Sequence, residues 1–180
     1  MSGGIDSTVT ALMLHAQGYE VVGITMKTWD YAAAGGSKKE TGCCNLDSFN
    51  DARQAAVEHG FAHYILDIRE EFGDFVIENF VDEYLAGRTP NPCVLCNTHI
   101  KWRALLKRAD ALGCDYIATG HYAKITQFEN GRFGVSKAID ENKDQSYVLW
   151  GLQQELLSRT ILPLGPYRKT QIRQMAHDYG

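Results

Sequence analysis

The feature that most constrains this chain is the run SGGIDS at residues 2–7, which stands directly before an amphipathic helix pattern. The adjacent glycines allow the backbone to turn tightly and to approach a ligand closely, because neither carries a Cβ. Apolar residues then recur at positions 9, 12, 13 and 16, the spacing of one helix face. A glycine loop that opens a helix directs free N–H groups and the positive end of the helix dipole at one point. An ordinary Ser/Gly helix cap is the simpler alternative, but the full run favours an anion-binding loop.

Asp6 is the unusual member of this loop. A carboxylate beside a phosphate site normally has a cation between the two, so we expect Mg²⁺ there. The spacing of the run matches neither the Walker phosphate loop nor the GxGxxG dinucleotide pattern.

The rest of the chain alternates helix and strand patterns, which predicts an α/β fold with a doubly wound parallel sheet. In such folds ligands bind at the carboxyl ends of the strands, where Met26, Gly120 and His121 are expected beside the opening loop. The expected strands cover residues 19–26, 61–68 and 116–119, with a hairpin at 124–136 around Asn130-Gly131. After the first helix, further helices are expected at about 48–59, 70–85, 97–112 and 168–179.

Two prolines between Gly87 and Asn97 predict irregular structure in that segment, with Asn97 capping the helix that follows. The helix at 70–85 carries a stripe of aromatic residues that we interpret as core: Phe72, Phe75, Phe80 and Tyr84.

Charge and cysteine usage limit the function classes. Residues 1–96 have a net charge of −8 and residues 97–180 one of +4, which is compatible with a polyanionic partner on one side, although a solvated mixed surface explains it equally well. Five cysteines, two of them adjacent, favour a reducing compartment over a secreted disulfide framework, so we expect a cytoplasmic protein. No run approaches the ~18 apolar residues of a membrane span.

The run SGGIDS resembles the signature of the ATP pyrophosphatase (PP-loop) superfamily, whose members cleave ATP between the α and β phosphates and adenylate a substrate oxygen. The resemblance implies the adenine-nucleotide α-hydrolase-like form of the α/β fold. In that superfamily the loop follows a buried strand. Only Met1 precedes Ser2 here, so we expect the first strand to be missing from this chain.

Further stretches are similar to the tRNA-specific 2-thiouridylase family, from Ser2 to Gly180. They are GCC at 42–44, GRTPNP at 87–92, CN at 96–97, IK at 100–101, ATGHY at 118–122 and KDQSY at 143–147. That family adenylates the C2 oxygen of the wobble uridine of certain tRNAs with ATP and replaces it with sulfur from a cysteine persulfide. The resemblance implies tRNA as partner and a sulfur-relay protein or cysteine desulfurase as sulfur donor. The runner-up is another ATP-dependent tRNA thiolase or an amidating synthetase of the superfamily.

The resemblance also implies a role for individual residues. Those expected to bind ATP are Ser2, Gly3, Gly4, Ile5, Asp6, Ser7, Met26 and Gly120. Those expected to contact tRNA are Asn91, Pro92, Cys93, His121, Lys143, Asp144 and Gln145. Cys96 is the expected catalytic thiol, with a second catalytic cysteine beyond Gly180. Residues 1–140 would form the PP-loop domain and 141–180 the start of a tRNA-contacting region.

Cys93 stands where many members of the family carry Asp, which puts any role needing a carboxylate there in doubt. Three alternatives remain for the pair Cys93 and Cys96: a spectator beside the nucleophile, a redox-sensitive disulfide, or ligands of an iron–sulfur cluster. A non-catalytic zinc module is a fourth, although no further ligand beyond His99 is evident. We favour Cys96 as an essential thiol that acts through a persulfide, because a place at a helix start lowers a thiol pKa.

Overall fold

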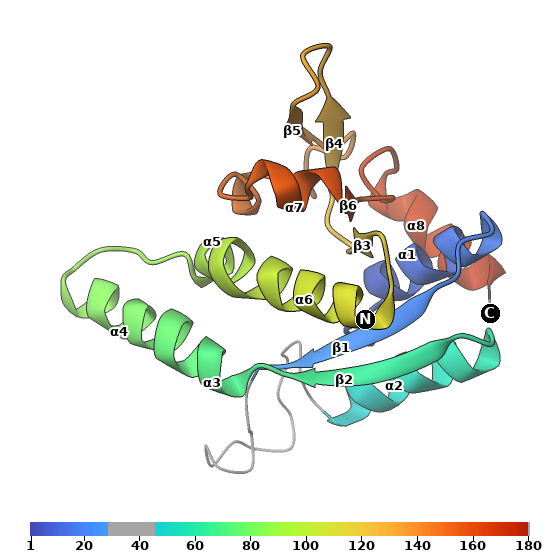
Figure 1. Cartoon of the computed structure of the whole chain (residues 1–180), viewed down its shortest axis with the longest axis horizontal. Coiled ribbons are helices and arrows are strands. Elements are labelled where there is room, and N and C mark those ends of the chain that lie inside the picture. Colours follow the sequence, from blue (N-terminus) through green and yellow to red (C-terminus); the bar gives the residue numbers. More distant parts are fainter. Residues whose placement is uncertain (29–45, 180) are drawn as a thin grey trace.

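The structure, a computed structural model, describes residues 1–28 and 46–179 (Figure 1). The α-helices are α1 (Ile5–Ala16), α2 (Leu46–Glu58), α3 (Arg69–Phe72), α4 (Glu78–Leu85), α5 (Pro92–Leu95), α6 (Trp102–Leu112), α7 (Gln154–Ser158) and α8 (Lys169–Asp178). The strands are β1 (Val22–Lys27), β2 (Ala62–Asp67), β3 (Ile117–Ala118), β4 (Ala123–Gln127), β5 (Phe133–Lys137) and β6 (Thr160–Ile161). The described ranges also contain the π-helices η1 (Gly73–Ile77) and η2 (Cys96–Lys101) and the 3₁₀-helix η3 (Ser146–Val148).

The strands confirm the predicted α/β class with parallel pairing. β1 pairs with β2 from Val22↔Ala62 to Lys27↔Asp67, and β3 pairs with β6. These two parallel pairs are separate sheets in the described structure, and β6, only two residues long, is a strand that the sequence did not predict. The predicted hairpin is confirmed as antiparallel β4–β5, with Gly131 at φ 78° in its turn.

The main chain of Met1 lies along the edge of β1. Its amino group donates to the Ile24 carbonyl, and its own carbonyl accepts from Thr25 Oγ1 at 2.7 Å. The main chain of Met1 thus hydrogen-bonds to one edge of β1.

Helix α1 is buried on two faces, and this fixes the loop that precedes it. Ala11 and Leu12 pack with α2 and with Phe61, which precedes β2, whereas Val9 and Met13 pack with Leu164 and α8. Burying an aliphatic side chain of this size contributes roughly 1.5–3 kcal/mol. The amphipathic pattern thus anchors α1 between two layers, with its N-terminus facing outward.

The proline-rich segment corrects two predictions. It contains a regular helix, α5, in which Pro92 takes the first position, where a missing N–H group does no harm. Asn91 provides the cap, because its Oδ1 accepts from the Val94 N–H at 3.3 Å. Asn97 is therefore not a cap: it is buried inside the helical run, and its side chain donates to the Val148 carbonyl at 3.2 Å.

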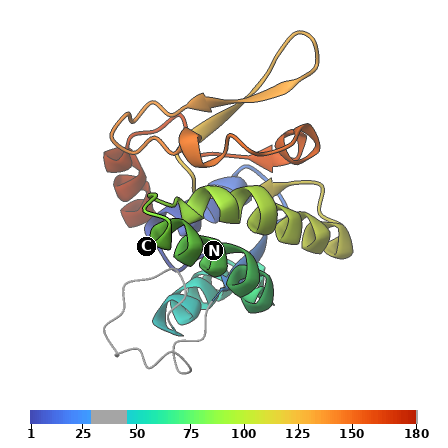
Figure 2. The same ribbon diagram turned by 90° about the vertical axis from the view of Figure 1, so that its left-hand side faces the viewer.

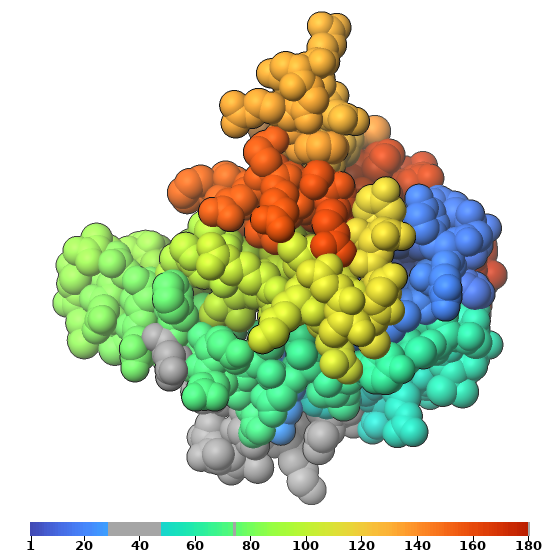
Figure 3. All heavy atoms as spheres, viewed as in Figure 1, coloured from blue at the N-terminus to red at the C-terminus, as the bar shows by residue number. Residues whose placement is uncertain are grey.

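The predicted aromatic core stripe is largely wrong. Phe72 packs against a buried cluster, but Phe75, Phe80 and Tyr84 are exposed by 42–70%. Helix α4 projects from one side of the molecule (Figures 1 and 3), and the β4–β5 hairpin projects from another (Figures 2 and 3). Amphipathic spacing predicted a helix correctly there, but the helix lacks an apolar layer to cover that face.

Candidate functional site

The opening loop is seated on α2 through its first glycine. Gly3 has φ 71°, and a Cβ on it would lie 2.4 Å from the Ser48 carbonyl oxygen. Both the conformation and the neighbour exclude a side chain, which explains why glycine stands at this position.

The first turn of α1 presents donors to solvent. Gly4 is the N-cap in an extended conformation, and among the described residues no side chain caps the turn. Ser7 Oγ lies 3.2 Å from Ser2 Oγ, accepts from the Ser2 N–H at 2.9 Å and donates to the Gly4 carbonyl at 3.0 Å. Uncapped N–H groups at the positive end of a helix dipole, with two hydroxyls beside them, suit a phosphate group.

The segment after β3 touches this loop, as the strand-end argument predicted. A Cβ on Gly120 would lie 2.9 Å from the Asp6 carbonyl carbon and 3.0 Å from the Ser7 nitrogen. Such close backbone approach requires glycine, so the structure brings Gly120 and the SGGIDS loop together.

Asp6 has two partners that sequence reasoning missed. Its Oδ1 accepts from Tyr122 Oη at 2.8 Å and from Lys169 Nζ at 2.6 Å. Burial, together with the Asp6 carboxylate, raises the pKa of Tyr122 and keeps the phenol protonated as a donor. Lys169 lies 163 positions along the chain from Asp6, and no local pattern signals the contact.

His121 is held as a neutral imidazole. Its Nδ1 lies 2.8 Å from Thr119 Oγ1, and its ring centroid lies 5.5 Å from that of Trp102. Burial, helped by the charge of Lys101, lowers the pKa of His121 to about 3. At neutral pH the side chain can therefore exchange hydrogen bonds with a bound base without carrying charge.

Cys96 lies in an apolar cluster together with Met26. The cluster contains Ile68, Val76 and Ile100, with Met26 and Cys96 packed against it, so the predicted thiol and an expected ATP contact share one neighbourhood. Cys93 is exposed one turn earlier, and both residues carry reduced thiols, so no disulfide joins them.

The placement of Cys96 corrects one sequence argument. The helical run begins at Pro92 and is capped by Asn91, so Cys96 lies a full turn inside it, at the junction of α5 and η2. Its thiol is not at a helix start.

Of the predicted tRNA-contacting residues 143–145, the first is exposed to solvent and the other two make hydrogen bonds within the protein. Lys143 is exposed. Asp144 accepts from the Ala138 N–H at 2.8 Å and from Ser146 Oγ at 2.7 Å. Gln145 clamps the backbone of Tyr122: its Oε1 accepts from the Tyr122 N–H at 3.0 Å, and its own N–H donates to the Tyr122 carbonyl at 2.8 Å.

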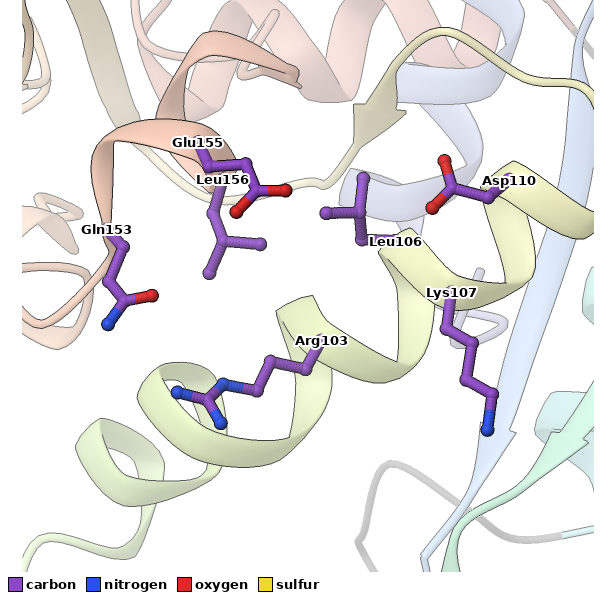
Figure 4. Close-up of a pocket in the computed structure, with 7 residues that line it drawn as sticks. All are labelled: Arg103, Leu106, Lys107, Asp110, Gln153, Glu155 and Leu156. Carbon is purple, nitrogen blue, oxygen red and sulfur yellow. The ribbon is translucent and has the colours of Figure 1, made fainter.

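A shallow groove of about 410 Å³ lies elsewhere, between α6 and α7 (Figure 4). Arg103 and Lys107 come from α6, and Glu155 and Leu156 from α7. None of the predicted site residues lines it, and its lining contains no cysteine, serine or threonine. We therefore place the candidate site at the opening loop and not in this groove.

Metal binding and membrane insertion can be assessed for the described part of the chain. No group of three or more His, Cys, Asp or Glu side chains is placed there to hold a metal ion. A single carboxylate such as that of Asp6 suffices for Mg²⁺, because that ion commonly takes one or two carboxylates and completes its shell with water and substrate phosphates. No helix in the same ranges combines the length and the apolar character that crossing a bilayer requires.

Parallel strand pairs covered by helices define an α/β protein, in which a glycine loop opens an uncapped helix and a thiol lies near the end of a neighbouring strand. Sequence comparison gives the family. The chain belongs to the family described as tRNA methyl transferase HUP domain, which matches residues 1–180.

Curated relatives match along the whole chain. It is 71% identical to the tRNA-specific 2-thiouridylase MnmA of Amoebophilus asiaticus over 180 residues, which is 100% of this chain and 48% of that protein. Identity is 70% to the protein of the same name from Cytophaga hutchinsonii (100% and 49%) and 64% to that from Salinibacter ruber (100% and 48%). The chain thus spans about half the length of these curated relatives.

One solved structure also resembles the fold. A predicted subunit of tRNA methyltransferase from Methanocaldococcus jannaschii superposes with a TM-score of 0.46 at 17% identity, over 98% of this chain and 72% of that one. A likeness this weak supports no conclusion about this chain.

Proposed function

We propose that this chain is part of an ATP-dependent enzyme that 2-thiolates the wobble uridine of tRNA. The observation that carries the proposal is its 64–71% identity, over its full length, to three proteins named tRNA-specific 2-thiouridylase. The geometry of the opening loop and of Cys96 agrees with such chemistry.

ATP would bind at the opening loop. The N–H groups of the first turn of α1 and the hydroxyls of Ser2 and Ser7 would donate hydrogen bonds to the phosphates. The backbone of Gly3, Gly4 and Ile5 would lie against the phosphates. Asp6 would hold Mg²⁺, which neutralises phosphate charge when bound. Met26 and Gly120 would line the part of the site that holds the adenosine.

The tRNA would meet the opposite side of the site. Asn91, Pro92 and Cys93 form the exposed end of α5 and would contact the target base, with the neutral His121 beside it. Lys143 would meet the polyanionic backbone, while Asp144 and Gln145 would hold its loop in place.

The proposed chemistry takes three steps. The uridine C2 oxygen attacks the α-phosphorus of ATP, the bond to the β-phosphate oxygen breaks, and pyrophosphate leaves with the electron pair. The terminal sulfur of a cysteine persulfide then attacks C2, and AMP leaves with the oxygen. Attack of a second thiolate on the inner persulfide sulfur forms a disulfide and leaves the C2–sulfur bond. Cys96 is the proposed catalytic thiol of this exchange.

Within the described residues no third ligand joins Cys93 and Cys96 in a metal-binding group, so nothing there supports an iron–sulfur cluster. We further propose a cytoplasmic enzyme whose persulfide comes from a sulfur-relay protein or a cysteine desulfurase.

The test uses a full-length protein that carries this segment, with substrate tRNA and a persulfide donor. AMP and pyrophosphate are measured by chromatography, and 2-thiouridine by mass spectrometry of digested tRNA. Asp6→Ala should abolish AMP formation, whereas Cys96→Ser should still form AMP but no 2-thiouridine. Cys114→Ser is the matched control, since this thiol packs against the Leu106–Leu156 core cluster and not against the cluster that holds Cys96, and it should stay active. Thiolation by either Asp6→Ala or Cys96→Ser would overturn the assignment.

A further inference from the structure

Lys169 is the cation that the fold delivers to the opening loop. It is the first residue of α8, and its Nζ lies 2.6 Å from Asp6 Oδ1. Its side chain is only 19% exposed, and its ammonium lies 5.8 Å from the centre of the Tyr122 ring. A lysine that is partly withdrawn from water and directed at the loop is an unusual surface residue.

The backbone of Lys169 is held in place, but its ammonium can donate more hydrogen bonds than the one it gives to Asp6. The Lys169 N–H donates to Asp140 Oδ2 at 2.8 Å, and Ile172 of α8 packs in one buried cluster with Val9 and Met13 of α1. An ammonium has three donors, and the contact with Asp6 uses one. The four-carbon stem lets the charge move while its root stays in place.

The position of the ammonium is also informative. It stands against the carboxylate that we expect to face Mg²⁺, beside the uncapped first turn of α1. A divalent ion on Asp6 would replace the ammonium as partner of that carboxylate. The nearest anion for the displaced charge would then be the phosphate chain.

We propose that Lys169 is a phosphate-binding residue of the ATP site, held by Asp6 in the absence of nucleotide and transferred to the pyrophosphate portion of ATP when nucleotide binds. This inference rests on the proposed function. During adenylation the ammonium donates a hydrogen bond to the departing pyrophosphate, whose oxygen receives the electron pair of the broken phosphorus–oxygen bond. No proton is transferred. The alternative is an ion pair that only docks α8 onto α1.

The experiment measures binding of inorganic pyrophosphate and of adenosine separately, by calorimetry on the full-length protein without tRNA. Lys169→Met should weaken pyrophosphate binding at least tenfold and leave adenosine binding within twofold. Lys169→Arg, which keeps the charge, should recover most of the loss. Arg173→Met is the matched control, since it removes an exposed positive charge one turn further along α8, and it should bind both probes as the wild type does.

A second variant separates binding from docking. Asp6→Asn weakens the hold on the ammonium without removing it, so in Mg²⁺-free buffer this variant should bind pyrophosphate at least threefold more tightly than the wild type. Combining it with Lys169→Met should abolish the gain. A docking role predicts no gain, since it gives Lys169 no contact with pyrophosphate.

The proposal is overturned if Lys169→Met weakens adenosine and pyrophosphate binding equally, if Arg173→Met has the same effect, or if Asp6→Asn shows no gain. These outcomes differ from failure of the proposed function. That failure would appear as a wild-type protein that forms no AMP with tRNA, whatever its affinity for pyrophosphate.

Discussion

Replacing Gly120 with alanine tests how closely the end of β3 must approach the opening loop. The added Cβ would lie 2.9 Å from the Asp6 carbonyl carbon and 3.0 Å from both the Asp6 oxygen and the Ser7 nitrogen. Ordinary van der Waals contact begins at 3.4 Å. All three neighbours are backbone atoms, which cannot rotate aside, so the loop or the strand end would have to move by about 0.5 Å.

The expected magnitude follows from this overlap. Overpacking of a well-fitted site destabilises a protein by about 1–3 kcal/mol. In a domain of this size, a loss of about 2 kcal/mol lowers Tm by about 4–8 °C. Because the displaced atoms belong to the anion-binding loop, we also expect ATP affinity to fall about tenfold for each 1.4 kcal/mol of misfit that reaches the ligand.

Thermal unfolding and calorimetric titration with ATP measure the two effects. Gly73→Ala is the matched control: it adds the same methyl group, and among the described residues no atom lies within 4 Å of it. With φ −60°, this position also accepts alanine without strain, so its Tm should be unchanged or slightly raised. A Gly120→Ala protein with the Tm and ATP affinity of the wild type would refute the inferred contact.

Three further outcomes are expected. Because the folded-state pKa of His121 is about 3, against 6.5 ordinarily, the unfolded chain binds more protons between these values. Stability should therefore fall by about 2 kcal/mol from pH 6.5 to pH 5 in urea titrations, and His121→Gln should flatten that slope. Tyr122→Phe removes the 2.8 Å bond to Asp6 and should lower the free energy of unfolding by about 1–2 kcal/mol; an unchanged urea midpoint would show that the bond contributes nothing. Cys93→Asp should retain thiolation of tRNA and Cys96→Ser should lose it, by mass spectrometry of the tRNA, whereas loss in Cys93→Asp would mean that its thiol takes part.

Local patterns were enough for much of the fold. The apolar spacing after Ser7 predicted α1, and Asn130-Gly131 predicted the β4–β5 turn, because both depend on residues close in sequence. Strand-end reasoning also placed Gly120 against the opening loop correctly. The prediction of irregular structure at residues 87–97 was wrong because proline is excluded from a helix interior but is favoured at a helix start, where Pro92 stands.

The partners of Asp6 could not be predicted in the same way. Tyr122 lies 116 positions away and Lys169 lies 163, so only the packing of α8 and of Tyr122 itself against α1 brings them to Asp6. The prediction that the aromatic residues of α4 are buried was wrong for a related reason. Periodicity shows which face of a helix is apolar, but whether another layer covers that face is a property of the whole fold.

The π-helix η2 makes the fold sensitive to the number of residues between α5 and α6. A π-helix is an α-helix that has accepted an extra residue, and η2 lies between α5 and α6 over Cys96–Lys101, packed against η1 through Val76 and Ile100. Deleting one residue from η2 would let the run close as an α-helix and would rotate α5 by about 100° relative to α6. Asn91 and Cys93 would then face a different direction, although neither residue would have been changed. At the positions of this segment other than Cys96 and the buried Asn97 and Ile100, substitutions should therefore be tolerated far better than changes in its length.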